Sequence, residues 1–190
     1  MTLKLSRTAL LSICAWLFVM TTATAQQPVN ADARVQADFK DRVDKYMELH
    51  NRLEKESPPL KETKNPAEIK LSEDVLAKKI RDARKAAPQG EIFTPEVQQL
   101  FRRLMYPETV GTAGREAKEA IKEDAPKGGI SFKVNAAYPE GAPLPTVPPN
   151  FLAALPKLPE DLEYRIVDKH LILRDVHANI IVDFIPHAIR

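Results

Sequence analysis

The chain has 190 residues, of which 44% are hydrophobic and 28% are charged, a composition typical of a folded globular protein. It carries 28 basic and 26 acidic residues, so its formal net charge at pH 7 is only +2. Proteins that bind nucleic acid or an anionic membrane surface concentrate an excess of Lys and Arg. The balance of charge therefore argues against both of these partners.

The first 25 residues have the pattern of a secretory signal peptide. Lys4 and Arg7 give a positively charged start, residues 8–20 form a short apolar run, and small residues precede a cleavage site between Ala25 and Gln26. This run is shorter than the ~20 residues that a membrane span needs. We therefore expect an exported protein, periplasmic or extracellular, with no stable membrane span after cleavage. A permanent membrane helix is the alternative.

Removal of this leader would leave a chain without thiols. Cys14 is the only cysteine and lies inside the leader. A cysteine-free mature chain forms no disulfide, no thiolate nucleophile and no Cys-ligated metal site, so imidazole and oxygen atoms are the remaining metal ligands. Lipid anchoring at Cys14 is the alternative, although Ile13 is bulky where a lipoprotein motif requires a small residue.

After a flexible segment over 26–32, residues 33–125 are predicted to form amphipathic helices. The first has an apolar stripe at steps of three and four residues, made by Val35, Phe39, Val43, Tyr46, Met47, His50 and Leu53. Capping residues followed by Pro open the second and third helices, at Asn65 and Thr94. The expected helices span about 33–55, 66–87, 95–106 and 113–124.

Residues 126–190 are predicted to form a Pro-rich strap and an antiparallel β-meander. A short strand is expected at 130–134, and the Pro-rich passage 139–159 lies along the domain or serves as a PxxP-type ligand. Alternating β-branched and aromatic residues then predict three strands, at 162–167, 170–174 and 180–185. A small sheet and amphipathic helices each have an apolar face that must be buried against another element. We therefore predict an α+β protein whose N-terminal helices pack on the C-terminal meander, as one domain.

The alternation assigns one apolar and one polar face to the meander. The residues expected on the apolar face are Leu162, Tyr164, Ile166, Leu171, Leu173, Ile180, Val182 and Phe184. Those expected on the polar face, as cross-strand charge pairs, are Arg165, Arg174, Asp175 and Asp183. Arg165 and Arg174 are also the candidates for gripping a carboxylate or phosphate ligand.

A run of histidines and aspartates in the meander is the best candidate for chemistry. His170, Asp175 and His177, with Asp183 and His187 further on, could come together on adjacent strands as metal ligands or as a base with its carboxylate. Their spacing matches no metal signature, however, and the favoured interpretation is that they are polar residues at turns and on the solvent side. The sequence therefore assigns no catalytic residue, no resident metal and no cofactor.

The C-terminal cassette resembles the ending of a group of uncharacterised bacterial exported proteins. The resemblance is carried by LEYRIV at 162–167, LILRDV at 171–176 and ANIIVDFI at 178–185, preceded by LPKLP at 155–159. IFTP at 92–95 is similar to a second segment of that group. The resemblance covers most of the mature chain and implies export, and it implies no activity.

Three functions remain open on the sequence. The first is a non-enzymatic extracytoplasmic binding or structural module, whose partner would be another envelope protein or an extracellular protein. The second is a small metal-dependent enzyme or metal-binding protein that uses the C-terminal His/Asp cluster. The third is a holdase-like chaperone for exported chains. No serine lies in a Gly-x-Ser-x-Gly turn, which argues against nucleophilic hydrolysis.

Overall fold

The structure, a computed structural model, describes residues 30–58, 63–123, 125, 132–139, 141–145 and 147–189. The predicted leader, with Ala25 and Gln26, lies outside these residues, as do positions 130 and 131 of the predicted strand. Within the described ranges, every helix is too short or too polar to span a membrane.

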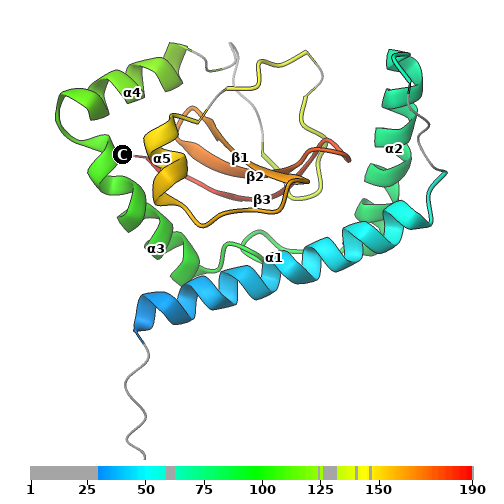
Figure 1. The fold of residues 1–190 in the computed structure, drawn as a ribbon, viewed down its shortest axis with the longest axis horizontal. Coiled ribbons are helices and arrows are strands. Elements are labelled where there is room, and N and C mark those ends of the chain that lie inside the picture. Colours follow the sequence, from blue (N-terminus) through cyan, green and yellow to red (C-terminus); the bar gives the residue numbers. More distant parts are fainter. Residues whose placement is uncertain are drawn as a thin grey trace, which may run out of the picture.

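The chain is an α+β protein, as predicted, with helices first and a three-stranded antiparallel sheet last. The helices are α1 (Ala31–Lys55), α2 (Pro66–Ala83), α3 (Pro95–Met105), the 3-10 turn η1 (Tyr106–Thr109), α4 (Gly111–Glu123) and α5 (Pro149–Ala154). The strands are β1 (Leu162–Val167), β2 (His170–Asp175) and β3 (Ile180–Ile185). Figure 1 shows α1 running along the sheet, with α2 at one end and α3 and α4 at the other.

The predicted caps fix the starts of the helices. The side-chain oxygen of Asn65 accepts a hydrogen bond from the Ala67 amide at 3.1 Å, and Thr94 caps α3 in the same way. Asn30 accepts from the amide of Asp32 at 3.0 Å and so starts α1 at Ala31. Two residues that we expected in a flexible segment are therefore helical.

The three strands pair in the order β1-β2-β3, with Glu163 opposite Arg174 and Leu171 opposite Ile185. Asp168 and Asn179 adopt φ values of +55° and +49° in the connecting turns. Short polar side chains tolerate this left-handed conformation better than branched ones do. The meander and its two turns therefore follow the sequence prediction.

A β-bulge changes which residues of β3 face the helices. The register shifts between Leu173 and Arg174, so that Asp183 and Ile181 lie opposite these consecutive residues and Val182 is the extra one. Beyond the bulge the alternation is inverted: Ile185 joins the main core, whereas Phe184 packs on the opposite side. The assignment of Phe184 to the helix-covered face was therefore wrong.

Both faces of the sheet are covered, so the prediction of a solvent-exposed polar face was also wrong. Tyr138, with Phe132 partly buried beside it, packs on the second face against Ile172 and Ile181. The covering segment runs beside β3, where Asn135 and Tyr138 donate backbone hydrogen bonds to Ile181 and Asn179. The described residues 132–134 form no strand, and Ala137 makes a single bridge to Ile180 instead.

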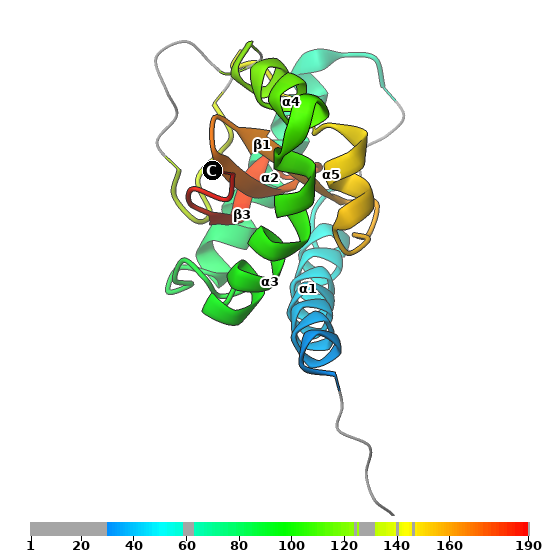
Figure 2. The same cartoon turned by 90° about the vertical axis from the view of Figure 1, so that its left-hand side faces the viewer.

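The Pro-rich passage packs along the domain through a few apolar residues. Val147, Phe151 and Leu155 are buried in the main core, whereas Leu152 is 45% exposed. Seen from the side in Figure 2, α5 lies beside α3 and the sheet. The passage therefore contributes to the core through α5.

Asp183 anchors the loop before α3 to the sheet. Its side chain is fully buried and accepts hydrogen bonds from the amides of Gly90, Ile92 and Phe93, at 2.9 to 3.0 Å. Phe93 then stacks against Phe39 of α1, with ring centroids 5.8 Å apart. A buried carboxylate that satisfies three backbone donors couples the loop, α1 and β3.

We expect the substitution Asp183→Asn to lower the free energy of unfolding by about 3 kcal/mol, because the amide replaces one acceptor oxygen with a donor that faces buried N–H groups. Urea denaturation followed by circular dichroism measures the change. Asp168→Asn, in an exposed turn, is the matched control and should shift stability by less than about 0.5 kcal/mol. Equal midpoints for the two variants would contradict the role given to Asp183.

Candidate metal centre

The structure brings together only two of the three histidines that the sequence grouped, His170 and His187, and places His177 elsewhere. His170 begins β2, and its ring lies 5.0 Å from that of His187 and 5.1 Å from that of Phe132. His177 lies in the turn after β2, beside α1. It lies seven positions after His170, which corresponds to about 20 Å along an extended chain. His170 and His177 therefore do not come together as members of one site.

Asp175, the third residue of the predicted cluster, is fully buried between the sheet and α1. Its Oδ2 accepts hydrogen bonds from the Tyr46 hydroxyl at 2.6 Å and from His50 Nδ1 at 2.7 Å. Its Oδ1 accepts from the backbone amide of Ala178 at 2.8 Å. Asp175 thus joins the turn between β2 and β3 to two residues of α1.

This network sets the ionisation of Asp175. Burial alone would raise the pKa of the carboxyl group, but its hydrogen bonds and charge interaction with His50, and the hydrogen bonds from Tyr46 and Ala178, outweigh burial and lower the pKa below its ordinary value. An ionised carboxylate can only accept hydrogen bonds, so Nδ1 of His50 carries the hydrogen in this pair.

His50 presents its second ring nitrogen to a small group of polar side chains. The residue is 0% exposed, and its Nε2 atom has no hydrogen-bond partner. Glu54 Oε2 lies 3.9 Å from Nε2, which is too long for a hydrogen bond. Burial lowers the pKa of His50, while the hydrogen bond and charge of Asp175 more than offset that effect. A buried nitrogen without a partner is rare in folded proteins and calls for an explanation.

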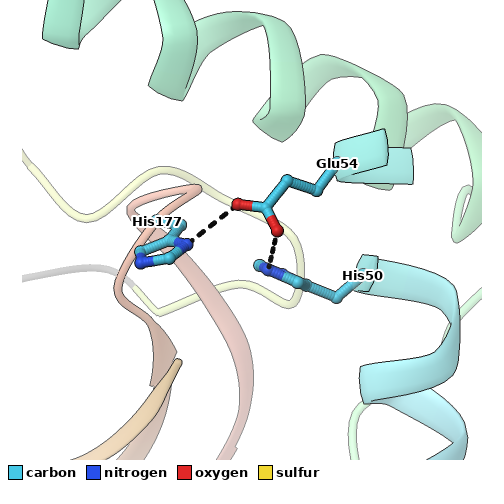
Figure 3. A group of neighbouring side chains, drawn as sticks. All are labelled: His50, Glu54 and His177. Carbon is cyan, nitrogen blue, oxygen red and sulfur yellow. Dashed lines mark hydrogen bonds and ion pairs between the residues drawn. The ribbon is translucent and has the colours of Figure 1, made fainter. Parts of the chain in front are cut away.

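Glu54 and His177 complete the group (Figure 3). Glu54 lies one helical turn after His50, so both side chains project from the same face of α1. Glu54 Oε1 and His177 Nδ1 are 3.0 Å apart, and the rings of His177 and His50 are 5.9 Å apart. One potential ligand atom from each residue lies within 4.8 Å of the others. Among the described residues, these three side chains form the group that could hold a metal ion.

The three side chains lie close enough to form a zinc site after a small rearrangement. Tetrahedral ligand atoms about 2.1 Å from a common Zn²⁺ lie about 3.4 Å apart, so the three atoms, which lie within 4.8 Å of one another, would have to close by up to roughly 1.4 Å. Glu54 and His177 can make this movement because their side chains are 47% and 51% exposed. Two imidazoles and one carboxylate form a donor set that zinc uses with water as its fourth ligand.

A further carboxylate lies near the second ring nitrogen of each histidine. Asp175 holds Nδ1 of His50, and Asp161 Oδ1 lies 3.6 Å from His177 Nε2, on the side of the ring away from Nδ1. Metal-binding histidines commonly place their other nitrogen against such a carboxylate, which fixes the ring orientation and increases its basicity. The pattern of a metal centre therefore extends beyond the three candidate ligands.

The two arginines proposed as ligand-binding residues are engaged with the protein. Arg174 donates hydrogen bonds to Glu163 and to the side chain of Asn179, and its guanidinium lies 5.9 Å from the centre of the Tyr138 ring. Arg165 pairs with Glu163 and donates to the carbonyl of Pro145. Glu163, which we had not singled out, is therefore the partner of both arginines, in place of Asp175 and Asp183.

Glu163 makes stability depend on pH. Partial burial acts to raise the pKa of its carboxyl group, but hydrogen bonds from Arg165 and Arg174 and their charges outweigh burial and hold the pKa below the ordinary 4.5. A lowered pKa in the folded state contributes stability above the unfolded-state pKa, and that contribution disappears as the pH falls through the folded-state pKa.

We therefore expect Glu163→Gln to be less stable than the unsubstituted chain above about pH 5, with the difference shrinking toward pH 3. Chemical denaturation at a series of pH values measures this difference. Glu160→Gln, an exposed site just before β1, is the matched control and should show no such trend. A difference that stays constant or grows toward low pH would show that the arginines do not stabilise the ionised carboxylate.

No family model, no curated protein and no solved structure matches the chain. The resemblance to exported bacterial proteins therefore stays a prediction, and the chemistry of this centre rests on its geometry.

Proposed function

We propose that this protein binds one divalent transition-metal ion, with Zn²⁺ as the best-fitting ion, through His50, Glu54 and His177. The observation that carries the proposal is the buried Nε2 of His50, which has no hydrogen-bond partner and faces Glu54 while Nδ1 is held by Asp175. A coordinated metal ion would satisfy this nitrogen.

An ordinary surface ion pair explains less of the geometry. Glu54 and His177 alone could form such a pair at 3.0 Å, and pairs of this exposure contribute little to stability. That explanation leaves Nε2 of His50 buried and unsatisfied, at a cost of about 1–3 kcal/mol. Coordination accounts for all three side chains and for the two carboxylates behind the histidines.

The site differs from the one expected from the meander alone. His177 supplies a ligand, Asp175 supports a ligand on another element, and His170 has no part in it. The leader pattern supports a location outside the cytoplasm, where a cysteine-free chain would depend on imidazole and carboxylate ligands. Of the functions that the sequence leaves open, metal binding is the one that specific contacts favour.

Removal of either exposed ligand should weaken metal binding. We expect His177→Ala and Glu54→Ala each to reduce Zn²⁺ affinity by at least about 100-fold, since loss of a supporting outer carboxylate alone typically costs 10- to 100-fold. Isothermal titration calorimetry on untagged protein measures the affinity. His170→Ala is the matched control, because it removes a histidine of the same meander that lies beside His187 and outside the proposed site.

Circular dichroism of the metal-free variants checks that the two substitutions leave the fold intact, as their half-exposed positions predict. Equal Zn²⁺ affinity in the unsubstituted chain and in His177→Ala would overturn the proposed site. A loss that also occurs in His170→Ala would place the ion elsewhere.

Metal binding should also stabilise the fold, because the ligands come from α1 and from the β2–β3 turn and are brought together only in the native state. Zn²⁺ at 100 times its dissociation constant should raise the free energy of unfolding by about 2.7 kcal/mol. Thermal or urea denaturation with and without Zn²⁺ tests this. Mg²⁺ should have no comparable effect, since it prefers oxygen ligands, and a Zn²⁺ effect that persists in Glu54→Ala would argue against the site.

A further inference from the structure

A cavity opens directly beside the proposed metal centre. It has a volume of about 600 Å³ and lies between the end of α1, the first half of α2 and the β2–β3 turn. Glu54 and His177 line its wall, whereas His50 is fully buried and is not among the lining residues. An ion held by the three side chains would therefore have its buried ligand behind it and its remaining coordination position toward the cavity.

The lining of the cavity combines apolar and charged side chains. Ile69, Leu76 and Val176 provide apolar wall, and Ser72 provides a hydroxyl group. Lys55 and Glu73 add one charge of each sign. Ligand pockets typically have this character, with a mostly apolar surface and a few polar groups that fix the orientation of the ligand.

The charges indicate the class of ligand. The two positive charges of the ion are reduced by one each for Glu54 and Glu73 and increased by one for Lys55, so a single positive charge remains among the groups that line the cavity. A monoanion balances this charge, whereas a phosphate dianion would exceed it. An oxygen donor also suits the open position of a zinc-type ion.

We infer that the cavity binds a small carboxylate with an apolar body, whose carboxylate coordinates the metal ion at the position that His50, Glu54 and His177 leave open. This inference rests on the proposed metal site. The apolar body lies against Ile69 and Leu76, and Lys55 pairs with the carboxylate from the rim. The protein would then recognise an organic acid through its metal ion, beyond merely holding the ion.

The experiment uses Co²⁺ in place of Zn²⁺, because the visible absorption of Co²⁺ reports its coordination shell. Benzoate is the probe, and its neutral analogue benzamide is the control ligand. Benzoate should change the spectrum of the Co²⁺ protein in a saturable way, and benzamide should leave it unchanged. Inorganic phosphate tests the charge argument and should produce a much weaker change.

Two variants separate the cavity from the metal site. Ser72→Trp fills the cavity and should abolish the benzoate response while Co²⁺ affinity stays within about twofold, and Leu71→Trp, on the exposed side of α2, is its matched control. Lys55→Gln should weaken benzoate binding roughly threefold to tenfold, and Lys78→Gln should not.

The outcomes distinguish this inference from the proposed function. If no Co²⁺ spectrum develops, the metal site itself is wrong and the inference falls with it. If Co²⁺ binds but benzoate leaves the spectrum unchanged, or if Ser72→Trp responds like the unsubstituted chain, the metal site stands and the carboxylate cavity is overturned. A response to phosphate that exceeds the response to benzoate would overturn the class of ligand.

Discussion

The carboxylate of Asp175 is the interaction on which the rest of the arrangement depends. It is a fully buried charge that reaches across more than 120 positions of sequence to Tyr46 and His50, and it closes its own turn through the amide of Ala178. A buried charge is tolerated only when hydrogen bonds replace the lost water, and here three donors do so. The same contacts fix α1 on the sheet, orient the ring of His50 and hold the turn that carries His177.

The fold could be predicted from local sequence patterns, but the candidate metal centre could not. Pro and capping residues marked the starts of α2 and α3, and alternation marked β1 to β3, because these signals act within a few residues. The group His50, Glu54 and His177 depends on how α1 docks on the β2–β3 turn, and no spacing encodes that. One signal was present. His50 is an ionisable member of the otherwise largely apolar stripe of α1, and Glu54 lies four residues after it, where a buried imidazole could find a partner.

The errors in assigning faces to the meander have more than one physical cause. Alternation assumes an uninterrupted ladder, whereas the extra residue Val182 inverts the faces of β3 beyond it. The prediction also assumes that one face of the sheet is exposed to solvent, yet Tyr138 and its neighbours cover that face. Asp183, next to the extra residue, is buried as the anchor of the loop before α3, and the strand arginines pair with Glu163. Asp175 is buried for a different reason: it lies two residues after Leu173 on β2, so ordinary alternation places it on the helix-covered face, where it contacts α1. Polar residues in a small sheet can indicate buried anchors as well as solvent exposure.

The division of the proposed metal centre into one rigid ligand and two adaptable ones bears on which ions it would accept. His50 is held in place by Asp175 before any ion arrives, whereas Glu54 and His177 are half exposed and can adjust. An ion without a strong geometric preference, such as Zn²⁺, suits one fixed nitrogen and two movable ligands. Ca²⁺ and Mg²⁺ are disfavoured by the two imidazoles, and Cu⁺ by the lack of thiolate among the three side chains. Because Nδ1 of His50 already donates to Asp175, a bound ion would also meet a defined lone pair on Nε2, so the proposed selectivity would depend on the same buried carboxylate that orders the fold.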